Sequence, residues 1–196
     1  MREQDAPTEP VDAPLVPASV TLPEITLKAV VLSILLAAVL AGANAYLGLF
    51  AGMTVSASIP AAVVSMAVLR LFRQSNILEN NIVQTAASSG EALAAGVIFT
   101  IPGLVLIGYW TTFDYWQTFT VSLVGGVLGV LFTIPLRRAL IIHARLRFPE
   151  GVATAEVLKV GASSDAGAGG RVRLLLGAAA LGGGFKFAEG GLKLWS

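Results

Sequence analysis

A long uncharged stretch near the start of the sequence sets the first structural expectation. Residues 29–69 contain no Asp, Glu, Lys or Arg. As one continuous helix this stretch would be about 61 Å long, twice the roughly 30 Å hydrocarbon core of a bilayer. We therefore predict two membrane spans, at residues 27–49 and 55–72. The turn between them, at residues 48–54, contains two glycines and no charge, so it is either very short or buried in protein.

Further apolar stretches follow and predict more spans. We expect them within residues 82–109, at 118–142 and, in a glycine-rich form, at 174–192. The predicted fold class is therefore all-α, a polytopic transmembrane helical bundle of about five spans.

A short helix and a linker are expected between the last two spans. Pro149 and Glu150 mark a helix start before residues 151–160, and the Gly- and Ala-rich residues 161–170 read as a linker. Whether residues 43–54 and 148–160 cross the membrane or form re-entrant or broken segments stays open at this point.

The first 24 residues have a different character. They hold five of the nine prolines, and five carboxylates against the single base Arg2. Repeated proline blocks helix formation, and there is little apolar surface to bury. We predict a disordered, acidic, proline-rich cytoplasmic tail over residues 1–24, followed by a transmembrane domain over residues 25–196.

Composition narrows the functional classes. Only 13% of the residues are charged and 55% are hydrophobic, which argues strongly against a soluble globular domain. A net charge of +1 gives no basic patch for nucleic acid, so we expect no nucleic-acid partner. With no cysteine and one histidine, we expect no cofactor, no metal site and no catalytic residue.

The basic residues predict an orientation. If the N-terminus is cytoplasmic, the loops expected outside contain no Lys or Arg, and the inner segments contain eleven: Arg2, Lys28, Arg70, Arg73, Arg137, Arg138, Arg145, Arg147, Lys159, Arg171 and Arg173. An excess of cations on the cytoplasmic side is the usual arrangement. We expect a multi-pass protein of the cell membrane, with the bilayer as its surroundings.

Polar residues within the third apolar stretch are candidates for a transport pathway. Glu91 would lie about 15 Å along a helix that begins near Asn81, close to the middle of the bilayer. An ionisable group at that depth usually faces a cavity, a partner or a substrate. Asn81, Gln84 and Ser88 lie on the same stretch and are candidate polar groups lining the pathway. A later helix start would instead place Glu91 at the interface, and close helix packing explains Ser88 equally well.

Two other segments contain candidates. Asn44 and Tyr46 end the first apolar stretch, where Gly48 and Gly52 allow either a polar break in the backbone or close packing. Glu150 is a second and weaker carboxylate candidate, because it also fits the N-terminal end of an ordinary interfacial helix.

Three segments together resemble the start of the oligopeptide transporter (OPT) family, nearest to its bacterial and yellow-stripe-like members. They are NAYLGLFAGMTVSASIPAA (44–62), ILENNIVQTAASSGEALAAGVIFTIPGL (77–104) and FPEGVATAEVLK (148–159). The resemblance implies a secondary transporter that imports short peptides or metal chelates by proton symport. Glu91 would then bind protons or cations, and the other candidate side chains would line the pathway.

Members of that family are much longer, so the resemblance also implies an N-terminal fragment whose partner is the remainder of the transporter or another copy. The alternative function is a truncated membrane protein that does not transport, or an assembly partner of a full-length relative. A channel is also conceivable. An intramembrane enzyme is disfavoured, because no second carboxylate has a spacing that matches Glu91.

Overall fold

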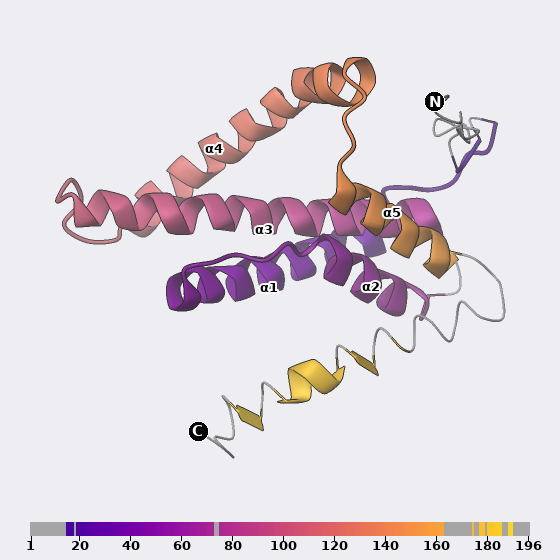
Figure 1. Ribbon diagram of the computed structural model, residues 1–196, viewed down its shortest axis with the longest axis horizontal. Helices are drawn as coiled ribbons and strands as arrows, with labels where there is room; N and C mark the ends of the chain where they lie inside the picture. The colour runs from indigo at the N-terminus through magenta and orange to yellow at the C-terminus, as the bar shows by residue number, and fades with distance from the viewer. Residues whose placement is uncertain are drawn as a thin grey trace, which may run out of the picture.

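The computed structural model describes residues 15–17, 19–72, 75–162, 174, 177–178, 180–185 and 188–189. Its elements are helices: α1 (Leu27–Ala51), α2 (Ser58–Leu69), α3 (Ile77–Leu106), α4 (Tyr115–Leu136), the π-helical turn η1 (Arg137–His143) and α5 (Pro149–Ala162). Figure 1 shows α1, α2 and α5 alongside α3, with α4 leaving the end of α3 at an angle. The predicted all-helical class is confirmed.

Three helical segments are long and apolar enough to cross a membrane. They are α1, α3 and the continuous segment Tyr115–His143, which joins α4 to η1. These confirm three of the expected spans, with α3 beginning earlier than residue 82. The predicted tail lies mostly outside the described residues, and so does much of the fifth expected span, at residues 174–192.

The second expected span, at residues 55–72, is corrected. Helix α2 has 12 residues, so it is about 18 Å long and too short to cross the hydrocarbon core. Pro60 gives the physical reason, because it lies in the first turn of α2, where a missing N–H costs nothing. A helix that started at Val55 would place Pro60 in its second turn. There the proline ring would clash with the Ser56 carbonyl oxygen and one backbone hydrogen bond would be lost, at a cost of about 3 kcal/mol.

The turn predicted at residues 48–54 is confirmed, and Gly52 forms it. Gly52 has φ 67° in the left-handed region, and its N–H donates to the Gly48 carbonyl oxygen over 3.0 Å. Only glycine adopts this conformation without a steric cost, which is why α1 ends here.

Helices α1 and α3 run parallel and pack closely through glycine. A Cβ atom placed on Gly48 would overlap the Ile98 side chain, and one on Gly90 would lie 2.9 Å from the Ala37 Cβ. Close backbone approach of this kind is how helices associate in lipid. The packing of α1 on α3 therefore fixes which α3 side chains face α1.

Helices α2 and α5 form a second contact beside the first half of α3. Ala62, Met66 and Leu158 make a buried cluster between them. Near the end of both helices, Gly161 lies directly against Met66, and Arg70 Nη2 donates to the Gly161 carbonyl oxygen over 2.7 Å. The two short helices thus run side by side and end together.

A buried ion pair joins the starts of α1 and α3. Lys28 Nζ lies 3.1 Å from Glu79 Oε2, and Glu79 is fully buried. Thr26 Oγ1 donates to the other carboxylate oxygen over 2.5 Å. Asn76 caps α3 in a reciprocal capping box with Glu79. These contacts hold the first turns of α1 and α3 side by side and so fix how the two helices are offset along their axes.

Candidate functional site

The backbone between α1 and α2 is not helical, although it lies beside a membrane-length helix. After the turn at Gly52, residues 53–57 run back along α1 to the start of α2 (Figure 1). Non-helical backbone is tolerated at membrane depth only where protein or water satisfies its polar groups. Here the Val55 N–H donates to Asn44 Oδ1 over 3.0 Å. Asn44 thus replaces one backbone hydrogen bond that a continuous helix would have made.

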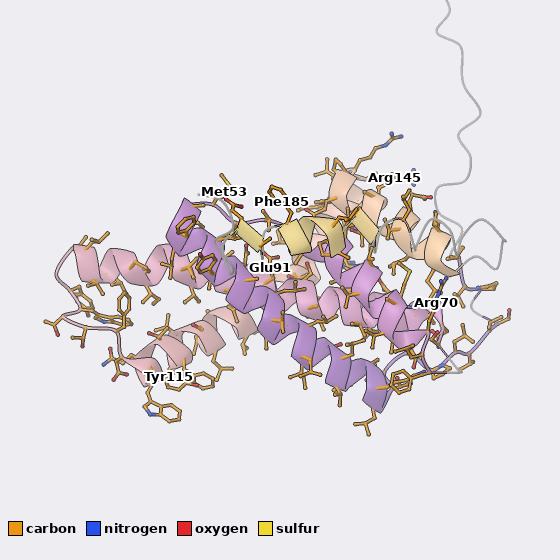
Figure 2. The ribbon with its side chains drawn as sticks, turned by 90° about the horizontal axis from the view of Figure 1, so that it is seen from below. Met53, Arg70, Glu91, Tyr115, Arg145 and Phe185 are labelled. Atoms are coloured by element: carbon orange, nitrogen blue, oxygen red, sulfur yellow. The ribbon has the colours of Figure 1, made fainter. Side chains whose placement is uncertain are left out.

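Glu91 lies near the midpoint of α3. It is about 21 Å from the first residue of the helix and about 22 Å from the last, and Figure 2 places it in the middle of the bundle. Only 7% of its surface is exposed. Asn44 Nδ2 donates a hydrogen bond to Glu91 Oε1, and the Ala57 backbone is a further partner of the carboxylate. The interpretation of Glu91 as a deep rather than interfacial residue agrees with this position.

Serines continue this polar group toward α5. The Ser58 and Ser88 hydroxyl oxygens are 2.9 Å apart and join α2 to α3, one turn before Glu91. Ser56 Oγ donates to Glu150 Oε1, at the start of α5. These hydrogen bonds thus connect α1, α2, α3 and α5 at about the same depth along the bundle. We call these residues the central polar cluster: Asn44, Ser56, Ser58, Ser88, Glu91 and Glu150.

Two short helices begin at the central polar cluster. Helix α2 starts at Ser58 and α5 at Pro149, and both then run toward the end of the bundle where α1 and α3 begin (Figure 1). A helix N-terminus carries a partial positive charge, which favours a nearby carboxylate. Hydrogen bonds from Ser56 and Ser58 hold the pKa of Glu150 below its ordinary value of 4.5. Glu150 is therefore ionised at neutral pH.

The structure brings together four of the residues that the sequence singled out: Asn44, Ser88, Glu91 and Glu150. The other three lie outside the cluster. Tyr46 is 66% exposed and stacks on Phe50, with ring centroids 5.7 Å apart. Asn81 is exposed, and Gln84 is half-buried and accepts a hydrogen bond from Thr85 Oγ1 over 3.4 Å. A role for these three stays a prediction.

Sequence reasoning missed Ser56 and Ser58. Both follow the turn at Gly52, in a stretch that was read as part of a span. Their only signal was the Ser-Ala-Ser spacing beside that turn, which can cap a helix start. Within the described residues, no group of three His, Cys, Asp or Glu side chains is placed to hold a metal ion.

Comparison with known proteins gives two findings. The profile of the family described as "OPT oligopeptide transporter protein" matches residues 24–194. A protein of Haemophilus influenzae with the name "Putative oligopeptide transporter" is 57% identical over 124 residues. That match covers 63% of this chain but only 19% of the relative, so the chain spans about a fifth of the relative's length. No solved structure matches the chain.

Proposed function

Since this chain belongs to the OPT oligopeptide transporter family, we propose that it forms the N-terminal part of a secondary transporter whose pathway passes the central polar cluster. The assembled protein imports oligopeptides or metal chelates, driven by a proton gradient. The observation that carries the proposal is the buried Glu91 carboxylate at the midpoint of a membrane-length helix. A carboxylate at that depth is costly and is seldom kept without a functional role.

The hydrogen bonds of Glu91 suggest how proton binding changes the protein. The ionised carboxylate accepts from Asn44 Nδ2. A protonated carboxyl group keeps less acceptor capacity and loses its charge, so this bond weakens. Asn44 also holds Val55, and protonation of Glu91 therefore loosens the non-helical segment 53–57. Segments of this kind build substrate sites in other secondary transporters.

The orientation remains the one predicted from the basic residues, with a cytoplasmic N-terminus and a cytoplasmic tail at residues 1–24. Lys28 and Arg70 support it, because both lie at the end of the bundle where α1 and α3 begin. That end would face the cytoplasm. The central polar cluster, at the N-terminal ends of α2 and α5, would then face the side of the membrane opposite the cytoplasm.

The fourth helix supports assembly with further helices. Helix α4 has 22 residues, and among the described residues none of them is buried. An apolar helix needs lipid or other helices around it, and small residues such as Gly125 and Gly129 allow close approach. We expect the remainder of a transporter, or another copy of the chain, to pack here.

The deciding experiment is an uptake assay of Glu91→Gln. The protein should be expressed from its own locus, so that any sequence after Ser196 is included, and reconstituted into proteoliposomes. Glu91→Gln keeps the size and the Asn44 contact but cannot titrate. We expect normal insertion, and peptide uptake that no longer responds to an inward proton gradient.

The matched control is Glu156→Gln, since Glu156 is exposed and pairs with Lys159 on the outer face of α5. It should behave as the unmodified protein. Uptake by Glu91→Gln with an unchanged response to the proton gradient would refute the proposal.

A further inference from the structure

We propose that the central polar cluster, together with Thr154, binds a primary ammonium group. The source is either the amino terminus of a transported peptide or a small free amine. This inference rests on the proposed function, because it names the chemical group that the pathway recognises.

The net charge of the cluster favours a cation. Glu91 and Glu150 face the start of α2 and interact electrostatically with each other. The N-termini of α2 and α5 each contribute roughly half a positive charge, which leaves about one negative charge when both carboxylates are ionised. Among the described residues, the ion pairs of Lys28 with Glu79 and of Lys159 with Glu156 involve neither carboxylate.

Thr154 gives an independent indication of a ligand-binding position. Its side chain is 4% exposed, and its hydroxyl oxygen has no hydrogen-bond partner among the described residues. A buried hydroxyl group that makes no hydrogen bond is rare in folded proteins and costs free energy.

Thr154 lies on the same face of α5 as Glu150. It follows Glu150 by four residues and precedes Leu158 by four, so all three share one face of α5. That face packs on α2: Leu158 contacts the cluster of Ala62 and Met66, and Glu150 accepts from Ser56 at the start of α2. Thr154 therefore lies on the α2-facing side of α5, between Glu150 and Leu158.

An ammonium group matches the available acceptors. It carries one positive charge and three N–H donors. Glu91, Glu150 and the Thr154 hydroxyl oxygen can accept one donor each, and the ligand would satisfy the Thr154 hydroxyl. Protonation of Glu91 would remove its charge and one acceptor, so proton binding and amine binding would be coupled.

Binding to the purified, complete protein in detergent tests the inference separately from transport. The probes are trialanine, N-acetyl-trialanine, which lacks the ammonium group, and methylammonium, which is only an amine. We expect trialanine to bind about tenfold or more tightly than its acetylated form, because a charge-assisted hydrogen bond is lost. Binding of both peptides with equal affinity, or no binding by any of the three probes, would overturn the inference.

The three probes also identify the source of the group. If trialanine binds and the acetylated form does not, the group is the peptide amino terminus. If methylammonium binds and neither peptide binds, the ammonium site stands and its ligand is a free amine.

Two variants link the affinity to these residues. Glu150→Gln should weaken trialanine at least tenfold and leave the acetylated peptide unchanged. Thr154→Val removes a hydroxyl that has no hydrogen-bond partner among the described residues. It should therefore leave thermal stability unchanged or raised while it weakens the binding of trialanine. The control Glu156→Gln should bind like the unmodified protein. Unchanged affinity in both variants would overturn the assignment.

The two proposals fail in different ways. If Glu91→Gln keeps uptake that responds to the proton gradient, the proposed function fails, and the binding preference for a free amino terminus is untouched. If uptake is proton-coupled but acetylated and free peptides bind alike, only the ammonium site fails.

Discussion

The Asn44 amide group joins the Glu91 carboxylate of α3 to the backbone of the α1–α2 connection. Its Nδ2 donates to Glu91 Oε1, and its Oδ1 accepts from the Val55 N–H over 3.0 Å. Asn44 is 2% exposed, so water does not compete for either bond. One side chain thus holds both a buried charge and a non-helical piece of backbone.

Replacing Asn44 should therefore destabilise the protein more than replacing an exposed neighbour. Asn44→Leu removes one hydrogen-bond partner from the buried Glu91 carboxylate and one from the Val55 N–H, at about 1.5–3 kcal/mol for the charged group and about 0.5–1.5 kcal/mol for the neutral one. We expect a clear drop in the thermal unfolding midpoint in detergent. Tyr46→Phe, two residues further along α1 at an exposed position, is the control and should change nothing. Equal stability of Asn44→Leu and the unmodified protein would mean that the bridge contributes little.

The ion pair at the start of α1 and α3 gives a second stability prediction. Lys28→Met leaves Glu79 buried with Thr26 and the capping box as its remaining partners. Removing one partner of a buried pair costs about 3–5 kcal/mol, and less here because the Lys28 side chain is 22% exposed. We expect a loss of about 2 kcal/mol or more in denaturant unfolding.

Lys159→Met is the matched control for this pair. Lys159 pairs with Glu156 on the surface, with side chains that are 49% and 59% exposed, and such pairs contribute about 0–1 kcal/mol. Comparable losses for the two lysine variants would show that burial of the Lys28 pair adds nothing.

The helices were largely predictable from the sequence, because apolar length alone identifies membrane-length segments. The uncharged turn at Gly52, the start of α5 at Pro149 and the Glu156–Lys159 pair were also readable locally. The short length of α2 was readable too, since Pro60 stands in the sequence. The short length of α2 was missed because the uncharged stretch continues through the non-helical residues 53–57.

The site was only half predictable, because its contacts join residues far apart in the sequence. Asn44 and Glu91 are 47 positions apart, and Ser56 and Glu150 are 94 positions apart. An ionisable residue deep within an apolar stretch pointed to Glu91, but its partner Asn44 did not follow from the sequence. The rotation of α3 about its axis was not readable from the sequence: Asn80 faces inward and accepts from Ser65 over 3.1 Å, whereas its neighbour Asn81 is exposed.

The lowered pKa of Glu150 predicts a stability change with pH. Because hydrogen bonds from Ser56 and Ser58 lower the folded-state pKa below 4.5, the ionised carboxylate stabilises the fold above that pH. This contribution falls as the pH decreases through 4.5 and is lost below the folded-state pKa. The stability difference between the unmodified protein and Glu150→Gln should therefore be largest near neutral pH and shrink in acid. Ser56→Ala should reduce this pH dependence, and a pH-independent difference would contradict the assigned hydrogen bonds.

The contact of Gly161 with Met66 predicts that α5 tolerates no side chain there. A Cβ on Gly161 would overlap the Met66 sulfur and lie 2.9 Å from its terminal methyl carbon, so Gly161→Ala should push α5 away from α2. Overpacking of this kind costs about 1–3 kcal/mol. Because α5 carries Glu150 and Thr154, we also expect weaker binding of trialanine.

The double variant Gly161→Ala with Met66→Ala isolates this contact. Truncating Met66 makes room for the new methyl group, so the double variant should be more stable than the sum of the two single changes predicts. Gly96→Ala is the control, because a Cβ there meets no atom within 4 Å among the described residues. If the double variant shows simple additivity, Gly161 and Met66 are not in direct contact. The position of α5 beside the central polar cluster would then depend on the Arg70 hydrogen bond and the Leu158 cluster alone.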